Sequence, residues 1–228
     1  MKKKIILFSI IGVVAVCIVT VIFTGLHANS PTKGAAIAPY DNPKTALLVI
    51  DVQNDITTNT GRYGDTTEFL GNVNQAITYA EETGMEILYV KNIYAENSII
   101  LLLAGGQFKD GTEGAELDDN LLTVNENIFT KSVGDSFSSR EFEDYLISNS
   151  VDTLYIIGAD ASACVYSTAR GGLNRGYNVN IIENAIITNS DGALQQMLKL
   201  YETNGIGVID LEAFEKLQLI DGASVIGC

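Results

Sequence analysis

The sequence contains few of the residues on which many catalytic sites depend. Its 228 residues include one histidine, three cysteines and three prolines. The single histidine, His27, lies close to the N-terminus, so a Cys–His catalytic pair in the rest of the chain is excluded. The low proline content and the 46% of apolar residues argue against a disordered chain. The length suits one sizeable α/β domain.

Basic residues are also scarce. Lys and Arg number 14 against 28 Asp and Glu, and three of the lysines lie within residues 1–28, which contain no acidic residue. The rest of the chain therefore carries 11 basic and 28 acidic residues, a net charge of −17. A surface of this sign repels phosphate groups, so we expect the domain surface to bind neither nucleic acid nor an anionic membrane.

The N-terminus is an apolar run that follows three lysines. Residues 5–26 are 22 consecutive residues without a charge. As a helix they would be about 33 Å long, against a hydrocarbon core of roughly 30 Å. We predict one span of the cell membrane through residues 5–26, with Lys2 to Lys4 in the cytoplasm and the rest of the chain outside the cytoplasm. A signal peptide cleaved after Ala28, which would give a secreted protein, is the alternative.

The chain is expected to have three parts. Residues 1–28 form the membrane anchor or signal sequence, residues 29–43 a linker of small and turn-forming residues, and residues 44–228 the folded domain. A disulfide between Cys164 and Cys228 is conceivable outside the cytoplasm. Cys228 is the last residue and chain ends tend to fray, so we expect Cys164 to be free.

From residue 44 onward, short apolar runs typical of buried strands alternate with amphipathic runs typical of helices. The strands are predicted at residues 45–50, 85–90, 127–130, 153–157, 177–182 and 205–209. The helices are predicted at residues 66–83, 138–147, 165–170, 191–203 and 212–217. This alternation indicates a three-layer, doubly wound α/β fold around a parallel sheet of about six strands.

Two local features refine this prediction. Ser138 and Glu141 have the spacing of a capping box at the start of a helix. Residues 93–125 have no clean period and are expected to form a long loop over the site. Within this loop, residues 98–104 fit either a helical turn under a lid or an oligomer contact, and a homo-oligomer is compatible with the pattern.

Three predicted strands are followed by chemically active side chains. Asp51 follows the first strand, Lys131 the third, and Cys164 the fourth after a short turn. The carboxyl ends of parallel strands meet at the sheet edge where such folds bind ligands, so the three side chains are expected to converge. Asp51 can accept the thiol proton, Lys131 can hold the charges, and Cys164 can attack a carbonyl carbon.

The state of the sulfur is a further prediction. Cys164 is expected in the first turn of a helix, where free backbone N–H groups favour the thiolate over the thiol. A buried structural cysteine is the alternative, because free cysteine is among the most buried residue types.

Three sequence motifs surround these positions. They are Leu-Leu-Val-Ile-Asp-Val-Gln-Asn-Asp over residues 47–55, Lys131 with Ser136-Phe137 after it, and Gly-Ala-Asp-Ala-Ser-Ala-Cys-Val over residues 158–165. Together they resemble the isochorismatase-like cysteine hydrolases, and the similarity covers about residues 44–210. The resemblance implies a Rossmann-like sheet in the order 3-2-1-4-5-6 and a catalytic triad of Asp51, Lys131 and Cys164. It also implies a cis peptide at Ala159–Asp160 and an oxyanion hole made by the amides of Asp160 and Cys164.

The sequence departs from this family at two points. Ala161 stands where the family commonly has Thr, and the Asp-x-His metal motif of nicotinamidase-like members is missing after the second strand. We therefore expect neither a metal nor a cofactor. Cys164 favours hydrolysis of a C–N bond in a small amide, ureido or cyclic amide substrate, through a thioester. Substrate contacts are expected from Asn54, Tyr94, Phe137 and Tyr166.

Two alternatives stay open at this point. A binding or assembly module could keep the fold without catalysis, and the missing Thr at position 161 is mild support for it. Isochorismatase-type cleavage of a vinyl ether, which needs no cysteine, is the other. The sequence does not identify the substrate.

Overall fold

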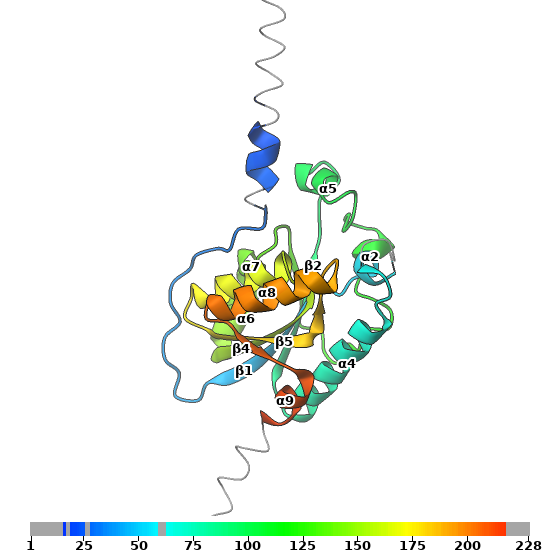
Figure 1. Ribbon diagram of the computed structural model, residues 1–228. Coiled ribbons are helices and arrows are strands. Elements are labelled where there is room, and N and C mark those ends of the chain that lie inside the picture. Colours follow the sequence, from blue (N-terminus) through cyan, green and yellow to red (C-terminus); the bar gives the residue numbers. More distant parts are fainter. Residues whose placement is uncertain (1–15, 17–18, 26–27, 59–62, 218–228) are drawn as a thin grey trace, which may run out of the picture.

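The fold is a six-stranded parallel sheet with helices on both faces (Figure 1). The computed structural model describes residue 16 and residues 19–25, 28–58 and 63–217. The strand order is β3-β2-β1-β4-β5-β6, and all five neighbouring pairs are parallel. The three-layer α/β architecture and the strand order predicted from the sequence are therefore confirmed.

The central strands are those with the most continuous apolar sequence. In sheet order, the strands are β3 (Ile128–Lys131), β2 (Glu86–Asn92), β1 (Lys44–Ile50), β4 (Val151–Ala159), β5 (Asn178–Ile187) and β6 (Gly207–Ile209). Residues 46–50 of β1 are completely buried. A strand can be apolar on both faces only when both faces are covered, which is why this run lies in the middle of the sheet.

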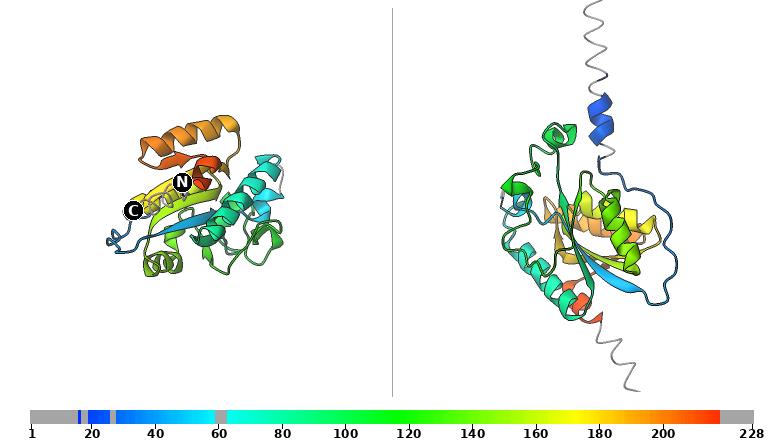
Figure 2. Two further views of the ribbon diagram at one scale, coloured as in Figure 1. Left: turned by 90° about the horizontal axis from the view of Figure 1, so that it is seen from below. Right: turned by 180° about the vertical axis from the view of Figure 1, so that it is seen from behind.

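Helices cover the two faces of the sheet separately (Figure 2). One face is covered by α4 (Thr67–Glu82) and α9 (Leu211–Glu215). The other is covered by α6 (Arg140–Ser148), α7 (Cys164–Leu173) and α8 (Asp191–Thr203). In α4 the apolar residues Phe69, Val73 and Ile77 recur at helical spacing and are buried. Burial of each large apolar side chain stabilises the fold by about 1.5–3 kcal/mol.

The start of α6 differs from the prediction. The predicted capping box of Ser138 and Glu141 is wrong, because α6 begins at Arg140 with Ser139 as its N-cap. Residues Ser136–Ser138 form a separate 3₁₀ turn, η2. Its first turn is capped by Asp135, whose Oδ1 accepts a hydrogen bond from Phe137 N at 2.9 Å. The carboxylate therefore stabilises a different local structure from the one that the Ser-x-x-Glu spacing indicated.

The long segment between β2 and β3 contains short helical pieces. It includes α5 (Ile99–Leu103) and the 3₁₀ turn η1 (Glu113–Ala115), which lies near the short helix α2 (Asn54–Thr57). The α5 helix falls within residues 98–104, where a helical turn was one of the two predictions. Its N-cap is Ser98, whose Oγ accepts a hydrogen bond from Leu101 N at 3.1 Å.

The first described helix of the chain lies at one end of the domain. Residues 19–25 form a helix that projects from the end of the molecule where α5 also projects (Figure 1). No helix within the described residues combines the length and apolar composition that a bilayer span requires. Most of the predicted span 5–26 lies outside those residues, as does Cys228. The span, the domain boundaries and the expectation that Cys164 is not paired with Cys228 stay predictions.

Candidate active site

The carboxyl ends of β1 and β3 deliver a buried ion pair. Lys131, the last residue of β3, places its Nζ 2.9 Å from Oδ2 of Asp51, which directly follows β1. The two side chains are only 0% and 2% exposed. An ion pair so completely shielded from solvent is screened little by salt and is held in one geometry.

Asn92 connects this ion pair to the cysteine. Its Nδ2 lies 2.6 Å from Asp51 Oδ2 and 3.3 Å from Cys164 Sγ. Cys164 is the first residue of α7, directly after the turn that follows β4. The structure thus brings Asp51, Lys131 and Cys164 together, with Asn92 between the carboxylate and the sulfur.

The position of Asn92 is itself fixed by a buried glutamine. Oε1 of Gln53 accepts a hydrogen bond from Asn92 N at 2.8 Å, and its Nε2 donates to Asn92 O at 3.0 Å. The same Nε2 donates to Ala115 O at 2.6 Å, which ties η1 to the site. Sequence reasoning missed Asn92 because it ended the second strand at residue 90. A polar residue two positions later, at the end of a buried strand, was the signal that could have found it.

The backbone at the ends of β1 and β4 has two unusual conformations. Asp51 has φ of +52°, and Gly158 has φ of +118°. A Cβ at residue 158 would lie 2.0 Å from Ile50 O, so only glycine permits this approach of the two strands. The Ala159–Asp160 peptide is cis, as the family resemblance implied.

Asp160 organises the turn that precedes the cysteine. Its Oδ1 accepts hydrogen bonds from Ser162 N at 2.7 Å, Ser162 Oγ at 2.6 Å and Thr188 Oγ1 at 3.0 Å, and its Oδ2 accepts one from Tyr63 Oη at 3.1 Å. The turn is therefore braced by neighbours of Ala161, although Ala161 lacks the hydroxyl that the family's Thr supplies. Both Asp160 and Cys164 line the site cavity described below.

Burial sets the protonation state of the site. Burial raises the pKa of the Cys164 thiol to about 12, and the negative charge of Asp51 adds to this while the positive charge of Lys131 opposes it. The resting sulfur is therefore a neutral thiol at neutral pH. The prediction that the helix N-terminus favours the thiolate is wrong, because desolvation of the sulfur outweighs the nearby partial charges.

Burial and the neighbouring charges also shift the pKa values of Asp51 and Lys131. Burial raises the pKa of Asp51 above its ordinary value, and Lys131 opposes this rise. Burial alone would lower the pKa of Lys131, but the charge of Asp51 and the hydrogen bond to its carboxylate oppose this, and the net pKa is raised. In its ionised form, Asp51 is placed to accept a proton from the Cys164 thiol. Within the described chain, its Oδ1 is buried and has no hydrogen-bond partner.

A cavity of about 350 Å³ opens above these residues. Asp51, Asn92 and Cys164 lie in its lining, together with apolar side chains that include Ile56, Tyr94, Ile100, Leu103 and Phe108. Most of these apolar residues come from the segment 93–125, in which only Tyr94 was singled out from the sequence as a substrate contact. A largely apolar pocket with a few converging polar groups is the usual form of a small-molecule site.

Of the four predicted substrate contacts, Tyr94 lines this cavity. The other three lie elsewhere. Asn54 Nδ2 donates to Glu113 O at 3.1 Å, and Phe137 packs in the core with the Arg175 guanidinium 4.6 Å above its ring. Tyr166 packs on the ring of Tyr201.

Among the described residues there is no group of three or more His, Cys, Asp or Glu side chains that could hold a metal ion.

Comparisons with known proteins give a consistent result. The family model for the isochorismatase domain matches residues 45–213. The uncharacterized isochorismatase family protein YddQ of Bacillus subtilis (strain 168) is 28% identical over 147 residues, which cover 63% of this chain and 78% of that protein.

Solved structures share the fold. A cysteine hydrolase from Pseudomonas syringae pv. phaseolicola 1448A has a TM-score of 0.70 at 16% identity and covers 81% of this chain and 97% of its own. N-carbamoylsarcosine amidase from Thermoplasma acidophilum has a TM-score of 0.63 at 22% identity and covers 74% of this chain and 96% of its own. Identities this low establish a common fold alone.

Proposed function

This chain belongs to the isochorismatase family, and we propose that it is a cysteine-dependent hydrolase that cleaves a C–N bond of a small amide, ureido or cyclic amide substrate. The observation that carries the proposal is the buried contact of Asp51 with Lys131 and Asn92, with the Cys164 thiol 3.3 Å from Asn92 Nδ2. These groups supply a base, a fixed positive charge and a nucleophile at one cavity. The structural likeness to an amidase is consistent with this class of substrate.

The first half of the proposed reaction forms a thioester. Asp51 accepts the proton of the Cys164 thiol as the sulfur attacks the carbonyl carbon of the substrate, so a C–S bond forms. The negative charge moves to the carbonyl oxygen, for which the amides of Asp160 and Cys164 are the proposed donors. Asp51 then gives its proton to the nitrogen as the C–N bond breaks, and the amine leaves.

The second half releases the acid. Asp51 accepts a proton from a water molecule, and the resulting hydroxide attacks the thioester carbon. The C–S bond breaks and the sulfur takes the proton back, which restores the thiol. The sum is hydrolysis of one amide by one water to an acid and an amine. Lys131 stabilises the ionised form of Asp51 throughout, and Asn92 keeps the carboxylate and the sulfur in reach of each other.

Turnover of a substrate panel tests this function. The full chain is incubated with small primary amides, ureido compounds and cyclic amides, and released ammonia, amine or ring-opened acid is measured. At least one class is expected to turn over, and Cys164→Ser is expected to lower its rate by about 10³-fold or more. Cys228→Ser, which changes the terminal thiol, is the control and should leave the rate unchanged. Binding without turnover of any class would favour a binding module, and undiminished turnover by Cys164→Ser would exclude the thioester mechanism.

We also propose that residues 5–26 anchor the chain in the cell membrane, with the hydrolase domain outside the cytoplasm. The support is the length of the charge-free run and the three lysines before it.

A further inference from the structure

The catalytic cavity is partly built by the chain that leaves the predicted membrane span. Gly25, Ala28 and Asn29 line it together with Asp51 and Cys164. Gly25 lies in the helix that includes residues 19–25, and these residues belong to the charge-free run. The rim of the cavity and the end of the predicted span are therefore the same place in the molecule.

The chain is attached to the domain almost directly after the predicted span. The carbonyl of Ala28 accepts a hydrogen bond from Gly134 N at 2.6 Å, and the carbonyl of Asn29 accepts one from Ser167 Oγ at 2.6 Å. Three residues later, Thr32 N and Oγ1 donate to Asp135 Oδ2 at 2.6 and 2.7 Å. In the sequence, only residues 26 and 27 stand between Gly25 and Ala28, the first residue that makes one of these bonds. A span through residues 5–26 would thus hold the cavity rim at the membrane surface.

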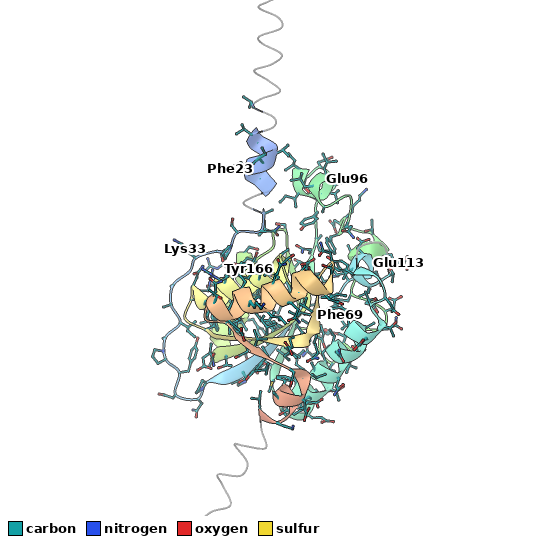
Figure 3. All side chains as sticks on the ribbon, viewed as in Figure 1. Phe23, Lys33, Phe69, Glu96, Glu113 and Tyr166 are labelled. Carbon is teal, nitrogen blue, oxygen red and sulfur yellow. The ribbon has the colours of Figure 1, made fainter. Side chains whose placement is uncertain are left out.

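The α5 helix stands beside this rim and exposes leucine. Leu101 is buried in a small apolar cluster with Ile56 and Tyr94, whereas Leu102 and Leu103 are 77% and 46% exposed. A methyl group at Gly25 would lie 3.8 Å from Leu103 Cδ1, so the two helices are near neighbours. Figure 3 shows Phe23, which is 60% exposed, on the N-terminal helix at the same end of the molecule as α5. Exposed apolar groups gathered in this way mark an interaction surface.

The α5 helix is held firmly in this position. The segment that carries it is closed at its base, where Tyr94 N donates to Phe108 O at 2.8 Å. Phe108 N in turn donates to Asp55 Oδ2 at 2.6 Å. The exposed leucines are thus presented by a fixed platform.

The charge around α5 differs from that of the whole domain. Residues 97–106 contain no charged side chain. Glu96, which precedes them, is paired with Lys109 at 2.6 Å. This end of the domain therefore offers an uncharged, apolar surface, which suits zwitterionic lipid. The rest of the domain is strongly acidic and would be repelled by anionic headgroups.

We propose that α5 inserts Leu102 and Leu103 into the interface of the bilayer that anchors the chain, so that the catalytic cavity opens onto lipid. The class of substrate that fits this arrangement is an amide with an apolar chain, which enters the cavity from the membrane between α5 and the N-terminal helix. The position of α5 does not depend on catalysis, whereas the substrate class rests on the proposed function.

The position of α5 is tested with a single tryptophan, because the natural sequence has none. Full-length Leu102→Trp is reconstituted in zwitterionic phosphatidylcholine vesicles, with and without bromine on the acyl chains, which quenches tryptophan on contact. The control is Ile147→Trp. Ile147 is 45% exposed and lies near the end of α6, just before β4 begins. It is therefore at the amino ends of the strands, whereas the cavity is at their carboxyl ends. We expect a blue shift and loss of emission for Leu102→Trp and no loss for Ile147→Trp.

Three results would overturn the position of α5. Emission of Leu102→Trp that bromination leaves unchanged would show that the leucines do not reach lipid. A blue shift without quenching would show that they are covered by a second copy of the chain. Equal quenching at both positions would also overturn the proposal, because it would mean that the domain has no preferred orientation at the bilayer.

The substrate class is tested with a series of amides of increasing acyl length in the same vesicles. We expect kcat/KM to rise with chain length, by up to about fourfold for each methylene buried. Leu102→Ser, which lies outside the cavity lining, should weaken this dependence and leave the shortest, soluble amide unaffected. A flat series with active enzyme would overturn the substrate class alone. If no amide of any length turns over, the substrate class falls together with the proposed function, while the quenching result still decides the position of α5.

Discussion

At the residue scale, the site depends on how a few side chains share their hydrogen bonds. Oδ2 of Asp51 is occupied by Lys131 and Asn92, and its Oδ1 is left to receive a proton. Asn92 has contacts with both the carboxylate and the sulfur, and none of the three motifs includes it. The sequence singled out Asp51, Lys131 and Cys164 as a proposed triad, whereas Asn92 was missed because the predicted second strand ended at residue 90 and its contacts join strands that become neighbours only in the fold.

Asn92→Leu should therefore damage the reaction without removing any group that transfers a proton. The substitution keeps the size of the side chain and removes the donor to Asp51 Oδ2 and Cys164 Sγ. We expect kcat to fall by about 10- to 100-fold. The Asn92 hydrogen bond lowers the pKa of Cys164, so iodoacetamide alkylation of that thiol should also require higher pH. Asn189→Leu, at an exposed asparagine, is the control. Unaltered alkylation in Asn92→Leu would argue that Asn92 has a structural role only.

The pH dependence of activity reports on Asp51. The carboxylate must be ionised to accept the thiol proton, so activity is lost as the pH falls through its pKa. Burial raises that pKa and Lys131 lowers it, so Lys131→Met should move the acid limb of kcat/KM to higher pH as well as reduce the maximum. The measurement is a pH–rate profile of both proteins. An acid limb that stays in place or moves to lower pH would contradict the proposed role of Lys131.

At the scale of elements, the site exists because β1 and β4 end close together. Gly158 allows this, since a Cβ there would meet Ile50 O at 2.0 Å and its φ is positive. Gly158→Ala should lower the free energy of unfolding by about 2–4 kcal/mol. Gly71→Ala, on the open surface of α4, should instead raise it by roughly 0.5–1 kcal/mol. Urea unfolding of both variants tests this, and equal effects would show that the close approach of the strands is not a constraint.

The segment before β1 is a second element with a specific attachment. Thr32 Oγ1 donates to Asp135 Oδ2 at 2.7 Å and accepts from Arg175 Nη1 at 3.0 Å. Thr32→Val removes both interactions and should weaken local attachment by about 1–3 kcal/mol. Hydrogen exchange of residues 28–37 should accelerate, whereas exchange in β1 should not. Thr123→Val, at an exposed threonine, serves as the control, and unchanged exchange in Thr32→Val would show that other contacts hold the segment.

Elements with strong periodicity were predictable and their ends were not. The apolar runs of β1 and β4 and the helical spacing in α4 identified the central layers correctly. The β2 strand continues to Asn92, two residues beyond the apolar run, because its polar end is stabilised by Gln53. Such a side-chain contact spans 39 residues and leaves no trace in local sequence.

At the scale of the whole molecule, the composition of the chain led to expectations about its partners but not about the shape of its cavity. Net charge and the apolar N-terminus indicated which partners to expect, but not that Gly25, Ala28 and Asn29 would line the same cavity as Cys164. The contribution of Gly25, Ala28 and Asn29 to the rim depends on the packing of residues 28–32 against the loop at Gly134 and the helix α7. The apolar cavity walls likewise come from irregular segments brought together by the sheet.

The proposed mechanism requires that an acyl group becomes attached to the sulfur of Cys164. The most direct measurement is mass spectrometry of the full chain, quenched in acid during turnover of an amide with an isotopically labelled acyl group. We predict a labelled thioester on the peptide that contains Cys164 and its absence in Cys164→Ser. Continued turnover with no label on that peptide, or with label at another residue, would contradict the central claim.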